Sequence, residues 1–164
     1  MLITELTRDE LHKLVRVLSW NDGFGCYTRA GFEKFIWPEI VEQAKWIIYF
    51  DIDDMHALNE AHGGYEAVDA MIKSVLAMAR TTDYMAGQWK SGDEFLICLA
   101  ESEGRGANLD PQGMMKRLSD ELQKHGLTAT FAIVPVISTD LATNVKPAID
   151  EVYATKKRLG KASR

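Results

Sequence analysis

Helical hydrophobic spacing recurs along the chain and alternates with shorter strand-like runs. Residues 7–18 carry apolar side chains every three to four positions, behind a threonine and a glutamate spaced as a capping box. The same spacing predicts a helix around Phe32, two helical stretches within 55–80 separated by a pair of glycines, and helices over 112–125 and 146–158. Each of these helices has one apolar face, so each is expected to pack against a common core.

Three shorter segments have the pattern of strands. Residues 45–52 (KWIIYFDI) form an apolar run rich in β-branched and aromatic side chains, which predicts a buried strand. Residues 83–100 predict a hairpin with KSGDE at its tip, and residues 127–137 predict a strand in which Pro135 favours an edge or a bulge. Hairpins mixed with crossover helices predict an α+β fold, with one palm-like, mainly antiparallel sheet flanked by helices.

The composition is that of an ordinary globular domain. Of 164 residues, 46% are hydrophobic and 26% are charged, and no linker or repeat divides the chain, so we expect residues 1–164 to form one domain. The formal net charge of -5 argues against a nucleic-acid-binding surface, and no apolar run is long enough to span a membrane. Cys26 and Cys98 lack metal-type spacing and the N-terminus lacks the order of a signal peptide, so we expect a cytoplasmic protein.

Two acidic clusters lie beside the predicted strands. Asp51 and Asp53 follow the run KWIIYF, and Asp93 and Glu94 lie in a glycine-containing turn before FLICL. If the two strands are neighbours, Asp51 and Asp93 converge, and carboxylates held close together repel unless a cation lies between them. Hard oxygen ligands without thiolates select Mg²⁺ or Mn²⁺, which hold phosphate oxygens in nucleotidyl transfer. The alternative is that these acids are solvated turn residues, which is the usual state of a strand-end aspartate.

Four segments match the landmarks of one family in order and spacing. They are NDGFGCYTRAGF at 21–32, FDIDDMHALNEAHGG at 50–64, SGDEF at 91–95 and VYATKKRLGK at 152–161. Together they span nearly the whole chain. The sequence resembles the GGDEF domain family of diguanylate cyclases, with SGDEF in place of the family signature.

The resemblance implies a metal centre and a reaction. Asp51 and Asp93 would hold the Mg²⁺ or Mn²⁺ ions with help from the Ile52 carbonyl, and Glu94 would belong to the same shell or orient it. In such enzymes two protomers each bring one GTP, and the 3′-hydroxyl of each attacks the α-phosphate of the other. The products are cyclic di-GMP and pyrophosphate, so turnover would require a homodimer.

The resemblance also implies a nucleotide site. Asn59 would read the base, Lys156 would bind the triphosphate, and Gly92 would let the backbone approach the nucleotide closely. Two positions depart from the family pattern. Ser91 replaces the first glycine of the signature and adds a hydroxymethyl group, and His56 replaces a lysine, which weakens a phosphate contact at neutral pH.

A further departure concerns the base. The aspartate that joins the asparagine in reading guanine aligns with Val68, and Asp69 is rotated from it by about 100 degrees on a helix. Valine cannot accept from the N1 and N2 hydrogens of guanine. We therefore expect a weaker guanine preference than is usual in the family, with ATP as a second candidate substrate.

An inhibitory product site is a weaker expectation. Such sites use Arg-x-x-Asp upstream of the signature, and Arg80 and Asp83 have that spacing but lie two residues farther from SGDEF than the family places them. The favoured interpretation of this pair is a helix-end charge and a turn residue.

Three functions remain open at this point. The first is a metal-dependent nucleotide cyclase that uses GTP or ATP, because the acids of the metal site are all present. The second is a catalytically degenerate GGDEF domain that binds a nucleotide or dimerises without turnover. The third is a related palm-domain polymerase that makes cyclic or linear oligonucleotides.

Overall fold

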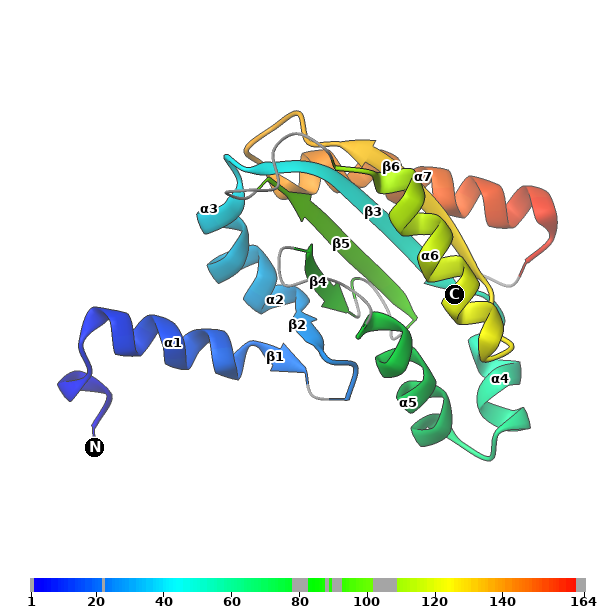
Figure 1. Ribbon diagram of the computed structural model, residues 1–164, viewed down its shortest axis with the longest axis horizontal. Coiled ribbons are helices and arrows are strands. Elements are labelled where there is room, and N and C mark those ends of the chain that lie inside the picture. The colour runs from blue at the N-terminus through cyan, green and yellow to red at the C-terminus, as the bar shows by residue number, and fades with distance from the viewer. Residues whose placement is uncertain are drawn as a thin grey trace.

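A six-stranded mixed sheet forms the centre of the molecule (Figure 1). The computed structural model describes residues 2–21, 23–77, 83–87, 89, 93–101 and 109–161. The strand order is β1-β2-β4-β5-β3-β6, and among these pairs β2–β4 is parallel and the others are antiparallel. The strands are β1 (Trp20–Asn21), β2 (Cys26–Thr28), β3 (Ala44–Ile52), β4 (Asp83–Gly87), β5 (Glu94–Ala100) and β6 (Ala129–Pro135). The expected α+β fold with a mainly antiparallel sheet is confirmed.

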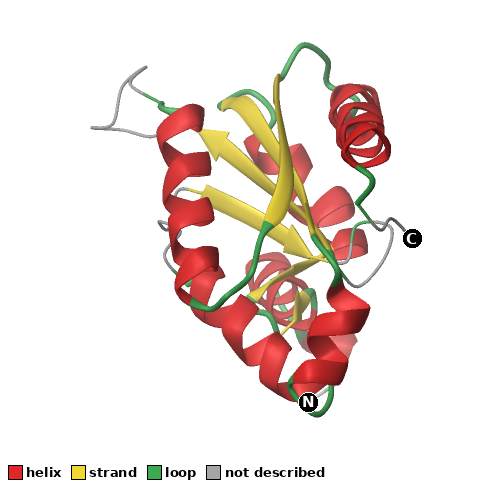
Figure 2. Cartoon of the chain, turned by 90° about the vertical axis from the view of Figure 1, so that its right-hand side faces the viewer, coloured by secondary structure: helices red, strands yellow, loops and turns green. Residues whose placement is uncertain are grey.

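The two central strands are buried on both faces. Every residue of β5 is buried, and in β3 the residues from Ile47 to the strand end are buried as well. A strand without a polar face must be covered on both sides, because each face would otherwise expose apolar surface to water. Helices lie on both sides of the strands in Figure 2.

Each face of the sheet has its own apolar cluster. On one face, Phe50 and Phe95 pack with residues of α5 (Tyr65–Leu76) and α6 (Pro111–Lys124). On the other face, Tyr49 and Leu96 pack with residues of α7 (Leu141–Leu159) and of the helical segment formed by α2 (Arg29–Gly31), a π-helical turn (Phe32–Ile36) and α3 (Trp37–Ile40). The odd residues of β3 therefore face α7, and the even residues face α5 and α6.

The N-terminal helix lies apart from both clusters. After a short 3₁₀ turn (Ile3–Glu5), α1 (Arg8–Leu18) begins at Thr7 with the expected capping box, in which the Thr7 hydroxyl accepts from the Glu10 N–H. No residue of α1 is buried, and the helix extends away from the sheet in Figure 1. Arg16 forms an ion pair with Glu39 of α3, which ties the end of α1 to the sheet body.

Two parts of the fold differ from the sequence predictions. The glycine-bearing segment after residue 19, expected as a turn, also contributes two short strands, the edge strand β1 and its neighbour β2. The last helix begins at Leu141 rather than at residue 146, because the Asp140 carboxylate caps it by accepting from the Thr143 N–H at 3.1 Å. Pro147 therefore lies inside this helix. Within the described residues, no helix combines the length and apolar character needed to cross a bilayer.

Candidate functional site

The acids of both sequence clusters lie at one end of the central strand pair. Because β3 and β5 are antiparallel, the end of β3 meets the start of β5, and Asp51 pairs with Glu94 in the register. The Ile52 N–H donates to the Asp93 carbonyl at 2.9 Å, which fixes the turn that carries Asp93 beside the end of β3. The side chains of the four residues, Asp51, Asp53, Asp93 and Glu94, are all buried, with exposed fractions between 2% and 5%.

A lysine from α7 compensates part of this buried negative charge. The Lys156 Nζ atom lies 3.1 Å from Asp51 Oδ1 and 3.5 Å from Asp53 Oδ1, and it donates to the Ile52 carbonyl at 3.4 Å. Lys156 is itself 1% exposed, so the ammonium has no contact with bulk water to offset its desolvation. A charge buried to this degree is stable only when it is paired, so Lys156 and the two aspartates stabilise one another.

Asp53 is fully engaged by neighbouring donors. Its carboxylate accepts from the Thr128 and Thr130 hydroxyls and from Lys161 Nζ, each at 2.9 Å. Burial alone would raise the pKa of Asp53, but the hydrogen bonds from Lys161 and the two threonines outweigh it and hold the pKa below its ordinary value. Asp53 is therefore ionised at neutral pH, and it anchors the segment after α7 to the start of β6.

The pKa of Asp51 is shifted in the opposite direction to that of Asp53. Burial raises its pKa first, repulsion from Asp93 adds to the rise, and Lys156 opposes both, so the pKa of Asp51 is about 7. The Lys156 ammonium only partly offsets the effects of burial and of Asp93 on the pKa of Asp51. An additional cation would therefore stabilise the charged form of Asp51.

Glu94 is held by the hydroxyl of Tyr153. The Tyr153 hydroxyl of α7 donates to Glu94 Oε1 at 2.8 Å. Burial and this hydrogen bond to Glu94 raise the pKa of Tyr153 to about 12, and burial together with Glu94 also raises the pKa of Tyr49. Both phenols are therefore protonated at neutral pH, and Tyr153 fixes the orientation of Glu94.

Among the comparisons with known proteins, only the one with solved structures finds similar proteins. No model of a known protein family matches the sequence, and no curated protein matches it. Solved structures do match. One is a microbial GGDEF domain studied for its interaction with cyclic di-GMP, with a TM-score of 0.64 at 18% identity, covering 88% of this chain and 94% of that chain. The chain has the fold of GGDEF domains.

Two further structures of this fold belong to longer proteins. Diguanylate cyclase SiaD of Pseudomonas aeruginosa, solved in complex with its activator SiaC, gives a TM-score of 0.67 at 17% identity and covers 94% of this chain and 64% of that chain. The S helix–GGDEF–EAL segment of LapD from Vibrio cholerae, bound to cyclic di-GMP, gives a TM-score of 0.59 at 15% identity. This match covers 92% of this chain and 36% of that chain. The chain thus spans somewhat less than two thirds of the SiaD chain and about a third of the LapD chain.

The two residues expected at the base occupy very different surroundings in this GGDEF fold. Asn59 of α4 (Met55–Ala61) is 6% exposed, and neither its Oδ1 nor its Nδ2 atom has a hydrogen-bond partner among the described residues. A buried amide without partners is costly unless a ligand supplies them. Val68 of α5 is 0% exposed and packs in the same cluster as Ile72 and Phe95, which differs from the expected place at a nucleotide. The half-buried Asp69 follows it, and burial raises its pKa.

The remaining predicted residues are spread over both ends of the sheet. His56 is exposed and lies 3.2 Å from Glu60 on the same helix, so it points to solvent. Asp83 is not the turn residue that the sequence suggested. It is the buried first residue of β4 and pairs with Leu99. Strand β4 thus begins one residue before the apolar stretch YMAG, at the end of the sheet opposite to Asp51. Arg80, Ser91 and Gly92 lie outside the described residues.

Sequence reasoning gave Lys161 and Tyr153 no role of their own at this site. Both belong to the closing segment VYATKKRLGK, so the signal was present, but their partners Asp53 and Glu94 lie far away along the chain. Their contacts follow from the packing of α7 against β3 and β5. The described residues contain no group of three or more histidine, cysteine, aspartate or glutamate side chains placed to hold a metal ion. A metal bound between Asp51 and Asp93 would therefore need further ligands from the backbone or from a nucleotide.

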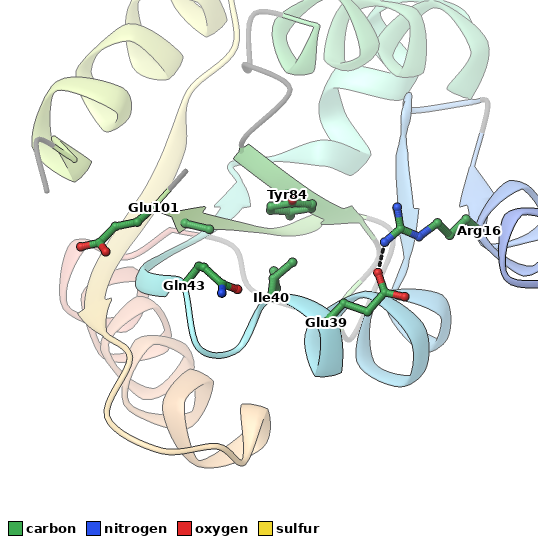
Figure 3. Close-up of a pocket in the computed structure, with 7 residues that line it drawn as sticks. Arg16, Glu39, Ile40, Gln43, Tyr84 and Glu101 are labelled. Carbon is green, nitrogen blue, oxygen red and sulfur yellow. Dashed lines mark hydrogen bonds and ion pairs between the residues drawn. The ribbon is translucent and has the colours of Figure 1, made fainter. Parts of the chain in front are cut away.

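A cavity of about 260 Å³ lies at the far end of the sheet (Figure 3). It is lined by Arg16, Glu39, Ile40, Gln43, Tyr84, Ala100 and Glu101. Ala100 is the last residue of β5 and Glu94 the first, so the cavity is separated from the acids by the length of that strand. The acidic site and this cavity are therefore distinct parts of the GGDEF fold.

Proposed function

We propose that this domain is a metal-dependent nucleotidyltransferase that joins two nucleoside triphosphates into a cyclic dinucleotide. GTP is the first candidate substrate and ATP the second. The observation that carries the proposal is the burial of Asp51, Asp93 and Glu94 together where β3 meets β5, with a lysine ammonium against Asp51. The diguanylate cyclase fold and the cyclic di-GMP ligand of similar structures support the same function.

The residues present fit a divalent cation. Burial and the nearby Asp93 raise the pKa of Asp51 to about 7, so a further cation beside Asp51 would stabilise its ionised form. The candidate ligands are carboxylate oxygens and the Ile52 carbonyl, which are hard donors that suit Mg²⁺ or Mn²⁺. Asp51, Asp93 and the Ile52 carbonyl would hold the ion. When bound, it supplies counter-charge for phosphate oxygens.

The protein's own groups would bind and orient the nucleotide. Lys156 is the buried cation beside the proposed metal ligands, and its ammonium would pair with the triphosphate. The buried Asn59 side chain has no hydrogen-bond partner among the described residues for its acceptor oxygen or its amide donors, so it would read the edge of the base. Tyr153 holds Glu94 toward the same end of the sheet, where burial keeps water from competing for these contacts.

The reaction needs two copies of this site. The 3′-hydroxyl oxygen of one nucleotide attacks the α-phosphorus of the other, the bond to pyrophosphate breaks, and the hydroxyl proton is released. A cyclic product requires this exchange twice, once in each direction. One domain binds one nucleotide, so we propose that turnover occurs in a homodimer and that its rate is second order in protein at low concentration.

The second candidate function is a degenerate domain that binds a nucleotide without turnover. It is favoured by the exposed His56, which pairs with Glu60 where the family resemblance expects a phosphate-binding lysine, and by the apolar Val68. Against it stand the buried acids. Burying carboxylates costs free energy, so a site that gathers Asp51, Asp93 and Glu94 is best explained by a ligand that needs them.

The test is product analysis with each of the four nucleoside triphosphates in Mg²⁺ or Mn²⁺. We expect pyrophosphate release and a cyclic dinucleotide with GTP, and a measurable product with ATP. Asp93→Asn should fold normally and lose turnover by roughly a hundredfold or more, because a charged group facing the transferred phosphate is lost. Wild-type pyrophosphate release by the Asp93→Asn protein would refute the catalytic assignment. Nucleotide binding without any product would favour the second candidate function.

A further inference from the structure

The Lys156 ammonium lies against the oxygens that the proposed metal ion would use. Its Nζ atom is 3.1 Å from Asp51 Oδ1 and 3.4 Å from the Ile52 carbonyl oxygen. Both oxygens belong to the ligand set proposed above. No other lysine among the described residues reaches either of them, since Lys161 pairs with Asp53 and Thr130 instead.

A divalent cation and this ammonium compete for the same oxygens. Mg²⁺ binds oxygen at about 2.1 Å, so an ion bound to Asp51 Oδ1 would lie no more than about 5 Å from the Nζ atom as it stands. Like charges at this separation in a buried site repel strongly, because little water screens them. The ion and the ammonium cannot both hold these oxygens in the present arrangement.

We propose that Lys156 is a built-in counter-cation that keeps divalent metal out of the nucleotide-free site. Metal binding then requires the ammonium to leave Asp51 and Ile52. An incoming triphosphate offers it a new partner, so nucleotide and metal enter together rather than independently. This inference rests on the proposed function, because it concerns the regulation of that same site.

The structure provides the means for this exchange. Lys156 is carried by α7 on a flexible four-carbon side chain, whereas Asp51 and the Ile52 carbonyl are fixed in the paired strand β3. The Asp53 carboxylate is held in place by Lys161, Thr128 and Thr130, and its Oδ1 atom is a second anchor 3.5 Å from the ammonium. The ammonium can therefore shift while one carboxylate contact is kept.

Metal binding to the nucleotide-free protein tests the proposal without any turnover. Mn²⁺ is titrated into the wild-type chain and into Lys156→Gln, and free Mn²⁺ is measured by electron paramagnetic resonance. Removal of the competing ammonium should tighten Mn²⁺ binding by roughly tenfold to a hundredfold, the range over which groups next to metal ligands change affinity. Lys157→Gln is the matched control, since it removes the same charge from an exposed neighbour and should leave the affinity unchanged.

A second measurement uses the unmodified chain, so it holds even if Lys156→Gln does not fold. Reductive methylation followed by peptide mass spectrometry reports the accessibility of each lysine. We expect Lys156 to be protected and Lys157 to be modified in the absence of metal. Saturating Mn²⁺ should expose Lys156 to the reagent and leave Lys157 unchanged.

The outcomes separate this proposal from the proposed function. Equal Mn²⁺ affinity in the wild type and in a folded Lys156→Gln protein, or Lys156 protection unchanged by Mn²⁺, would overturn the counter-cation role even in an active enzyme. Tighter binding by Lys156→Gln, or metal-induced exposure of Lys156, supports the role even if no nucleotide is turned over.

Discussion

A substitution at Val68 tests directly whether this residue of α5 lines a nucleotide pocket or belongs to the apolar core. If this residue lined a base pocket, Val68→Asp would supply the missing acceptor for guanine and shift selectivity toward GTP. The structure instead buries Val68 completely among Ile72, Phe95 and other apolar residues. We therefore expect Val68→Asp to destabilise the fold rather than to change base selectivity.

The expected magnitude follows from the cost of burying a carboxyl group. Raising the folded-state pKa of the new aspartate from about 4 to about 8 corresponds to about 5 kcal/mol of unfolding free energy near pH 8. A domain of this kind has a total stability of about 5–15 kcal/mol, so the variant should be marginal at neutral pH. Because the folded pKa is raised, the part of the loss that comes from ionisation is absent below pH 4 and grows as the pH rises toward the folded pKa.

Urea unfolding followed by circular dichroism measures this effect. Ala67→Asp is the matched control, because it adds the same charge to an exposed position of α5 and should change stability by less than about 0.5 kcal/mol. Val68→Thr keeps the shape of the side chain and buries one hydroxyl, which should cost about 1–3 kcal/mol. If Val68→Asp were as stable as the wild type and gained preference for GTP, the assignment of Val68 to the core would be wrong.

Two further predictions concern the acids. Tyr153→Phe removes the donor to Glu94 and should lower turnover by about tenfold while costing about 1–2 kcal/mol of stability; activity equal to the wild type would show that Glu94 does not need this hydroxyl. The pKa of Asp51 is about 7, above its value in the unfolded chain, so its contribution to stability is complete below about pH 4 and is lost as the pH rises through 7. Asp51→Asn should therefore lose less stability than the wild type between pH 5 and pH 8 in metal-free buffer, and parallel stability curves for the two proteins would contradict the raised pKa.

Local sequence signals determined most of the secondary structure. The run KWIIYFDI became the central strand β3, the residues flanking KSGDE became the antiparallel pair β4 and β5, and the Thr7–Glu10 capping box begins α1. These elements have strong periodicity or complete caps, so neighbouring residues alone specify them. The short strands β1 and β2 have only two and three residues, too few for a periodic signal, and they form because β2 pairs with β4 and β1 then pairs with β2.

The convergence of the acids at one end of the sheet was also readable from the sequence. Asp51 follows a predicted strand and Asp93 precedes another, and antiparallel pairing of two such strands necessarily brings these ends together. The type of ligand atom, and therefore the class of metal, depends only on residue identity.

The state of each charged group was decided by the tertiary structure. Lys156 and Lys157 are adjacent and chemically identical, yet the packing of α7 buries the first against Asp51 and leaves the second in solvent. Asp51 and Asp53 lie two residues apart at the end of β3, yet one has a raised pKa and the other a lowered pKa, because Thr128, Thr130 and Lys161 donate hydrogen bonds to the Asp53 carboxylate. Burial and hydrogen bonding depend on atoms from distant parts of the chain, so no local pattern encodes them.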